Sequence, residues 1–273
     1  MRRSYRADAR IVLALLRWTG RPIFDFWEAE ESGHLAGTTL VTYTGRAGMI
    51  SSVAVAPPWR RQGWARRLLG RAHRGILVAR RRYGVLEVLR ENGPARALYA
   101  QEGYAPIRSS RVLVREGPTP TPSGAVPGLR PFRPEDAAAL AELENAQIPE
   151  PVRRIFPAEA GQFRIPSYLL SATGSSTAAW VLDGPGGPRG FLRATVGGLT
   201  RTANLTQPIL ADGVEPELSA RLVGAALAWT GAQGLRKTIV QVPLDRPAAE
   251  ETLRSHGFRP AYEVDLFGRE LSP

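Results

Sequence analysis

Two segments in the first half of the chain contain the residues best suited to chemistry. The first, Arg60-Arg-Gln-Gly-Trp-Ala-Arg66, follows an apolar strand pattern and two prolines and leads directly into a helix pattern. Backbone N–H groups at a helix start lack intrahelical partners, and the helix dipole adds positive potential there. Gly63 and Ala65 allow a ligand close to the backbone, and three arginines add charge-assisted donors. The segment predicts a diphosphate cradle; an ordinary strand–turn–helix with a basic turn is the alternative.

The second segment runs from Glu87 to Tyr104. It begins in a short buried-strand pattern and continues as a helix with proline in its first turn, closed by Gly103. Three expected strands precede the first segment, at residues 24–30, 35–44 and 49–56, and another follows the second at 105–115. The two polar segments therefore follow two strands of one predicted sheet.

Together these segments resemble the GNAT superfamily of acyl-CoA-dependent N-acyltransferases, over roughly residues 22–115. The family's cofactor loop has Arg or Gln, two variable residues, Gly, one variable residue, then Gly or Ala. Arg60, Gly63 and Ala65 meet that pattern. The family's later motif is Asn-x-x-Ala-x-x-Leu-Tyr-x-x-x-Gly-Phe/Tyr. Six residues meet it: Asn92, Ala95, Leu98, Tyr99, Gly103 and Tyr104.

The resemblance implies acetyl-CoA as the cosubstrate and direct transfer of its acetyl group to a primary amine. It implies that strand residues bind the pantetheine arm through their backbone and that loop N–H groups bind the diphosphate. It also implies that Asn92 and Ala95 help to fix the cosubstrate near its thiol end. The implied strand and loop residues are Val53, Ala54, Val55, Arg60, Arg61, Gln62, Gly63, Trp64, Ala65 and Arg66.

Two side chains are candidates for proton transfer. Tyr99 matches the family's tyrosine that protonates the departing thiolate, and it also touches the cosubstrate. A phenol of pKa about 10 can donate to a thiolate whose acid has a pKa near 8.5. Glu87 matches the place of a proposed base, acting through water, in bacterial enzymes that acetylate ribosomal-protein N-termini. The alternatives are a core aromatic at 99 and a solvated glutamate at 87.

Charge is concentrated in the first half. The sequence has 273 residues and a net charge of +11, yet residues 1–116 hold 21 arginines against 9 acids, whereas residues 117–273 are nearly neutral. Such a field predicts an anionic partner. A phosphorylated cosubstrate fits better than nucleic acid, because the arginine-rich stretch lacks the interleaved aromatic residues of a single-strand binder. Nucleic-acid binding therefore ranks last among our hypotheses, after a non-catalytic acyl-CoA sensor.

Composition also excludes several classes of protein. The chain has no cysteine, which rules out disulfides, thiol nucleophiles and cysteine-ligated metals. Its three histidines show no metal-ligand spacing, so no metal is expected. The early apolar run at residues 11–16 is too short to span a bilayer, so we expect a cytoplasmic protein without a membrane partner. The expected partners are acetyl-CoA and an amine acceptor, either a small molecule or a peptide N-terminus. A homodimer stays open as the assembly.

The second half of the chain repeats the first at an offset of 154 residues. We therefore expect an α/β (α+β mixed sheet) protein with two tandem GNAT-like domains, each a mixed, mostly antiparallel sheet flanked by helices. Residues 1–116 form the catalytic copy, without the usual opening strand and helix. Residues 117–128 are a Pro/Gly-rich linker, and residues 129–273 are a degenerate, non-catalytic copy. In the second copy Tyr99 becomes Leu253, Asn92 becomes Arg246, Glu87 becomes Gln241, Gly63 becomes Glu217 and Ala65 becomes Ser219.

Overall fold

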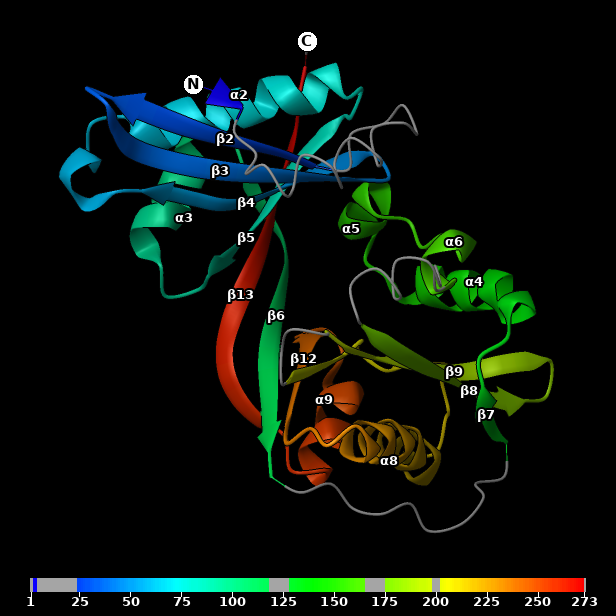
Figure 1. The fold of residues 1–273 in the computed structure, drawn as a ribbon. Helices are drawn as coiled ribbons and strands as arrows, with labels where there is room; N and C mark the ends of the chain where they lie inside the picture. The colour runs from blue at the N-terminus through cyan, green and yellow to red at the C-terminus, as the bar shows by residue number, and fades with distance from the viewer. Residues whose placement is uncertain (1, 4–23, 118–127, 165–174, 198–201, 273) are drawn as a thin grey trace. The chain divides into compact units, whose positions relative to one another are not determined.

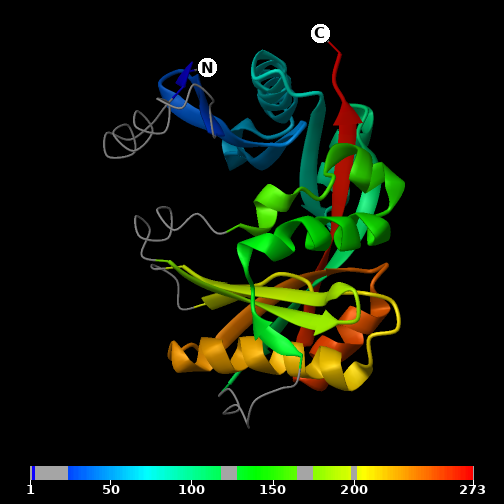
Figure 2. The ribbon, with the colours of Figure 1, turned by 90° about the vertical axis from the view of Figure 1, so that its right-hand side faces the viewer.

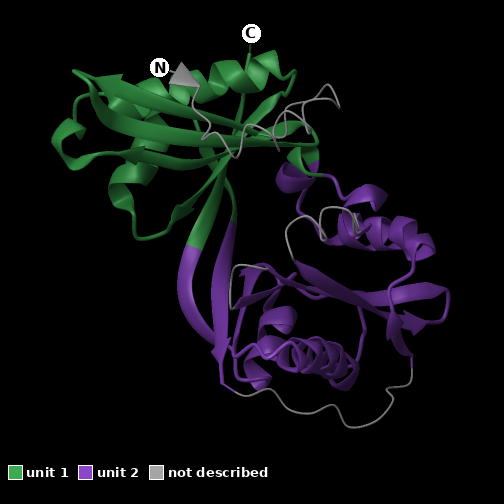
Figure 3. Ribbon diagram, in the orientation of Figure 1, with its two compact units in different colours: residues 1–108, 154–156, 264–273 green, residues 109–153, 157–263 purple. Residues whose placement is uncertain are grey.

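The structure is a computed structural model that describes residues 2–3, 24–117, 128–164, 175–197 and 202–272. It divides into two compact units (Figure 3). Unit 1 comprises Met1–Arg108, Arg154–Phe156 and Val264–Pro273, and unit 2 comprises Ser109–Arg153 and Pro157–Glu263. The linker predicted at 117–128 falls almost entirely outside the described residues, as does the segment before Phe24 apart from residues 2–3.

Unit 1 is built on a mixed sheet in the order β1-β2-β3-β4-β5-β13 (Figure 1). Strands β1 to β4 form successive antiparallel pairs, β4 and β5 are parallel, and β5 and β13 are antiparallel. The strands are β1 (Arg2–Arg3), β2 (Phe24–Glu31), β3 (His34–Thr44), β4 (Ala47–Val55), β5 (Tyr83–Leu89) and β13 (Arg259–Glu270).

Among the residues that the structure describes, two helices cover one face of the unit 1 sheet. They are α2 (Trp64–Val78), preceded by the 3-10 turn η1 (Pro57–Trp59), and α3 (Gly93–Gln101). Apolar residues of α2 recur at helical spacing and are buried, together with Tyr99 of α3, against Trp27 of β2. Gly75 lets α2 approach the sheet, since a Cβ there would lie 2.5 Å from the Trp27 ring. The helix stripe predicted from the sequence is therefore the core of unit 1.

Unit 2 has the same strand order with one parallel pair at the equivalent place. Its sheet runs in the order β7-β8-β9-β10-β12-β6, with β10 and β12 parallel and the other neighbours antiparallel. A two-residue strand, β11, pairs with β9. The strands are β6 (Ala105–Glu116), β7 (Leu129–Pro131), β8 (Ser176–Gly184), β9 (Gly187–Val196), β10 (Thr202–Leu205), β11 (Ile209–Leu210) and β12 (Lys237–Pro243).

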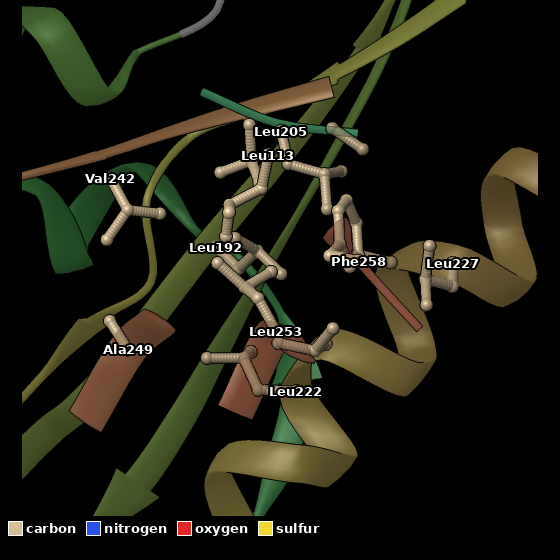
Figure 4. Close-up of a cluster of buried hydrophobic side chains, with 13 residues drawn as sticks. Leu113, Leu192, Leu205, Leu222, Leu227, Val242, Ala249, Leu253 and Phe258 are labelled. Atoms are coloured by element: carbon tan, nitrogen blue, oxygen red, sulfur yellow. The ribbon is translucent and has the colours of Figure 1, made fainter. Parts of the chain in front are cut away.

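Helices lie on both faces of the unit 2 sheet. Figure 2 shows α8 along one face of β8 and β9 and α4 along the other. The core beneath α8 contains Leu113, which comes from β6 (Figure 4). In the described part of the chain, no helix has both the length and the apolar composition needed to cross a bilayer. The helices are η2 (Pro134–Asp136), α4 (Ala137–Gln147), α5 (Glu150–Ile155), α6 (Ala160–Phe163), α8 (Pro216–Ala232) and α9 (Pro247–Ser255).

The two sequence copies exchange their last strands. β12, α9 and β13 begin and end 154 residues after β5, α3 and β6, so the predicted repeat extends to element boundaries. However, β13 of the second copy pairs with β5 of the first, and β6 of the first copy pairs with β12 of the second. The compact units therefore do not coincide with the copies at 1–116 and 129–273. The predicted fold class, an α/β protein with a mixed and mostly antiparallel sheet flanked by helices, is confirmed.

Candidate functional site

Strands β4 and β5 pair at first and then separate. Residues 47–50 pair in parallel with residues 83–86, and both strands then continue without pairing to each other. The separation begins at a β-bulge, where Ser52 has a φ of 54° and the register with β3 shifts. A bulge bends its strand and increases the local twist. The three residues predicted to bind pantetheine lie on the separated part of β4: Val53, Ala54 and Val55.

The loop after β4 ends in an open helix start. Gly63 is the N-cap of α2 with a φ of 79°, a left-handed conformation that favours glycine. No side chain caps the helix and its first turn holds no acidic residue. The first-turn N–H groups, at Trp64, Ala65 and Arg66, therefore have no intrahelical acceptor. A Cβ built on Gly63 would meet no atom within 4 Å, so the space there is open.

Most predicted loop side chains already contact other parts of unit 1. Arg60 donates to the Val55 carbonyl at 3.2 Å, and Gln62 donates to the Pro58 carbonyl at 2.9 Å. Arg66 forms an ion pair with Glu102 at 2.5 Å. The groups of this loop that are open to a phosphate are therefore the backbone N–H groups at the start of α2. The side chains of Arg60 and Arg66 already form contacts within unit 1.

Trp64 belongs to the hydrophobic core. It is 8% exposed, packs against Ala29 and Leu68, and meets Trp59 edge-on at 6.4 Å between ring centroids. Its ring therefore anchors the start of α2 against the sheet. The residue's contribution to a ligand would come from its N–H group.

Helix α3 positions the motif residues that follow β5. Asn92 is its N-cap, and the Asn92 Oδ1 accepts a hydrogen bond from the Ala95 N–H at 3.2 Å. Tyr99, on the inner face of the helix, is buried and touches Phe267, with 6.5 Å between ring centroids. Burial raises the pKa of Tyr99 above its ordinary value of 10. The phenol is therefore protonated at neutral pH.

Glu87 lies on the other face of the sheet. Its strand neighbours Leu86 and Val88 belong to the core that includes Tyr99, whereas Glu87 is exposed. Because side chains alternate along a strand, Glu87 faces away from α3. It stands opposite Leu266 of β13. Tyr99 and Glu87 therefore flank the separation of β4 and β5 from opposite faces.

The sequence did not reveal that the second copy supports Tyr99. Asp265 of β13 is buried and forms an ion pair with Arg96, one turn before Tyr99 on α3. Arg269 of β13 donates to the Glu102 carbonyl at 2.5 Å, just beyond the helix end. No local signal predicts these contacts, because they join residues that are 169 and 167 positions apart in the sequence.

A second polar pair lies between α2 and α3. His73 and the Tyr104 hydroxyl are joined by a hydrogen bond of 2.8 Å. Burial and the nearby Arg269 lower the pKa of His73 from 6.5 to about 4. Burial also raises the pKa of Tyr104 well above its ordinary value. Both groups are neutral at pH 7, so this pair fastens α2 to the end of α3 without charge.

The equivalent region of unit 2 has the same parallel strand pair followed by a helix, but different side chains stand at the motif positions. A cavity of about 460 Å³ is lined by residues from the α4 end, the segment after β11 and the start of α9. There Gln147 donates to the Leu210 carbonyl at 2.6 Å and accepts from Arg246 at 2.5 Å. Leu253, at the position of Tyr99, is fully buried. The first turn of α8 contains Glu217, a charge that repels phosphate.

Comparisons with known proteins agree with this geometry. Residues 22–106 match the family described as Acetyltransferase (GNAT) domain. No curated protein sequence matches the chain. A GCN5-related N-acetyltransferase from Sphaerobacter thermophilus superposes with a TM-score of 0.66 at 17% identity, covering 100% of this chain and 95% of that one. A tandem GNAT protein from the clavulanic acid biosynthesis pathway has a TM-score of 0.59 at 16% identity, covering 93% and 85%.

The matched family spans β2 to the start of β6, and it includes the separated strands, the open helix start and α3. These matched residues are similar to a GNAT acetyltransferase domain, and the whole chain is similar in fold to a tandem GNAT protein. The GNAT resemblance predicted from the sequence is confirmed for the segment that carries both motifs, residues 22–106.

Proposed function

We propose that unit 1 transfers the acetyl group of acetyl-CoA to a primary amine, with Tyr99 as the general acid. One observation carries the proposal. The separated edge of β4, the uncapped start of α2 and the protonated phenol of Tyr99 occur together at one end of the sheet. Each feature would serve one part of the reaction. The edge of β4 would bind the extended pantetheine arm, the N–H groups of α2 would bind the phosphates, and Tyr99 would protonate the leaving thiolate.

The residues present fit acetyl-CoA. The N–H groups of Trp64, Ala65 and Arg66 suit a diphosphate, because no intrahelical acceptor satisfies them and no acid stands in the first turn. The backbone of residues 53–55 suits the amides of pantetheine, with the Val55 carbonyl shared with Arg60. When bound, acetyl-CoA supplies an activated acetyl thioester.

In the proposed reaction, the amine nitrogen bonds to the acetyl carbon and the carbon–sulfur bond breaks. The acceptor begins as an ammonium and loses two protons, one before the attack and one after it, and the second is released to solvent. Glu87 takes the first through water, as an exposed carboxylate on the face opposite Tyr99. Tyr99 gives its proton to the departing thiolate and regains one from solvent. Backbone N–H groups near Val53 stabilise the oxygen that gains negative charge.

Unit 2 is proposed to be non-catalytic, and the second copy at 129–273 to be a support for the first. Leu253 has no proton to donate, and Arg246 does not cap α9. The Gln147 amide donates a hydrogen bond to the Leu210 carbonyl, at the position where the strand would otherwise bind a cosubstrate arm. These substitutions remove the acid, the cap and one free acceptor together.

Thiol release from acetyl-CoA with a panel of primary amines tests the proposal. The decisive variant is Tyr99→Phe, which keeps the ring in the core and removes the proton donor. We expect its rate to fall at least about tenfold, since positioned acids contribute about 10² to 10⁴. Tyr262→Phe is the matched control, because Tyr262 is 48% exposed on β13 and lies in unit 2.

Two outcomes would contradict the proposal. A Tyr99→Phe rate within twofold of the wild-type rate on a confirmed acceptor would refute the acid role. Tight acetyl-CoA binding with no thiol release for any amine would make the chain an acyl-CoA-binding sensor.

A further inference from the structure

Glu87 stands in an apolar surface. On the same face of the sheet, Leu89 follows it two residues along β5 and Leu266 stands opposite it on β13. Met49 of β4 stands opposite Val85, the preceding residue of that face. Phe156 packs on the same buried cluster as Met49 and Leu266. We call this surface the acceptor face: Met49, Glu87, Leu89, Phe156 and Leu266.

We propose that the acceptor of unit 1 is a monocationic primary amine with an apolar group beside its amino group, bound on the acceptor face. This inference rests on the proposed function and names its substrate class. The ammonium would approach the Glu87 carboxylate, and the apolar substituent would cover the neighbouring side chains.

Exposure within the acceptor face supports an apolar occupant. Leu89 is 39% exposed, and Leu266, Phe156 and Met49 are each partly exposed around the one carboxylate. Large contiguous apolar patches mark binding sites, and these side chains share one face of β4, β5, β13 and the segment packed on them. The negative charge of Glu87 complements a positively charged amino group on that occupant. The apolar neighbours of Glu87 complement an apolar group next to the amino group.

The charge of the surroundings limits the occupant to one positive charge. The first copy has a large excess of arginine, which repels a polycation from unit 1. Glu87 supplies the acidic side chain of the acceptor face, and its other members are apolar. A second cationic group on the acceptor would gain nothing from the leucine, methionine and phenylalanine side chains around it.

The second copy supplies part of this surface. Phe156 follows α5, and Leu266 belongs to β13, yet both lie within unit 1. Ile155 beside Phe156 is buried against Tyr83 and Val85, which fixes this segment on the sheet. The degenerate copy therefore contributes to acceptor choice in the domain that has the GNAT motifs.

A matched panel of acceptors tests the inference. Aminoacyl amides of leucine, methionine, serine, glycine and lysine are compared by thiol release, together with tetrapeptides that begin with the same residues. We expect leucine and methionine to exceed glycine and serine by about tenfold in kcat/KM, as one buried aliphatic group provides. Lysine should be the poorest. Amides and tetrapeptides distinguish a small amine from a peptide N-terminus as the source of the group.

Two exposed leucines give a test variant and its control. Leu89→Ser should reduce the preference for leucine over serine about threefold or more, with acetyl-CoA binding unchanged. Leu35→Ser removes a leucine that is 50% exposed on β3 of the same unit and should leave the preference intact. Equal use of polar and apolar acceptors would overturn the inference alone. No thiol release with any acceptor would overturn the proposed function and the inference with it.

Discussion

Two phenylalanines near the C-terminus provide a direct test of the strand exchange. Phe258 and Phe267 both belong to the second copy and lie nine positions apart. Phe258 is 2% exposed in the core of unit 2, whereas Phe267 is 3% exposed in the core of unit 1. Replacing each with alanine therefore makes the same chemical change in two different cores.

Both substitutions should be strongly destabilising, each for its own unit. A buried Phe→Ala change costs about 3–5 kcal/mol, from lost burial and from the cavity that remains. Phe267 contacts the ring of Tyr99, and the guanidinium of Arg96 lies 5.8 Å from its ring centroid. Phe267→Ala should therefore loosen α3 and admit water beside Tyr99. The raised pKa of the Tyr99 phenol should then fall towards its ordinary value.

Hydrogen exchange with peptide resolution separates the two effects. A loss of about 3 kcal/mol raises exchange from the open state more than about a hundredfold. In Phe267→Ala the faster peptides should come from β5 and α3, and in Phe258→Ala from α8, α9 and β12. Titration of the tyrosine absorbance in Phe267→Ala, compared with Phe267→Ala/Tyr99→Phe, measures the change at Tyr99.

The refuting result is equally specific. If Phe267→Ala accelerates exchange in α8 and α9 and leaves β5 and α3 protected, then β13 completes the sheet of its own copy. The account of how Tyr99 is positioned would then be wrong as well.

Two further predictions concern a titration and a backbone conformation. Because the pKa of His73 is about 4 in the folded chain and 6.5 ordinarily, its contribution to stability is complete above pH 6.5 and is lost as the pH falls towards 4. Urea unfolding at pH 7.5 and 4.5 should show a loss of about 1–2 kcal/mol, after allowing for solvent screening, that is absent from His73→Gln. Gly63→Ala should cost about 1–2 kcal/mol at its positive φ and weaken acetyl-CoA binding, measured by calorimetry. Gly70→Ala, inside α2 with open space around it, should leave acetyl-CoA binding unchanged and raise stability by about 0.5–1 kcal/mol.

The elements that hold the proposed site could be predicted from local patterns. The apolar spacing of α2 and the proline and glycine at the ends of α3 depend on interactions within a few helical turns. The repeat at 154 residues is visible because both copies contain the same local patterns. The Asn92 motif residue is also explained locally, because its side chain caps α3 at Ala95. Such features depend on neighbours close in sequence, so a sequence is enough to reveal them.

The strand exchange could not be predicted in this way. β6 and β13 have equivalent positions in the repeat, and their registers with β12 and β5 are equivalent too. An alternating strand pattern is satisfied equally well beside either partner. The choice depends on contacts far apart in sequence, such as Arg96 with Asp265, that neither copy reveals alone.

The bulge at Ser52 was also hidden from the sequence. A positive φ is usually signalled by glycine or asparagine, and serine gives no such signal. Strand alternation does place Val85, Glu87 and Leu89 on one face. The residues that surround that face come from β4, from α5 and from β13, so only the folded chain defines it.

The position of β13 sets the order in which the protein can be completed during synthesis. Most of unit 1 comes from residues up to Arg108, yet the strand that pairs with β5 comes from β13, more than 150 residues later in the sequence. Domains generally fold in the order of synthesis, and here unit 1 cannot be completed until residues 264–270 have been synthesised. A chain that terminates anywhere before Val264 leaves β5 as an open edge and exposes the side of Tyr99, so incomplete products are expected to aggregate.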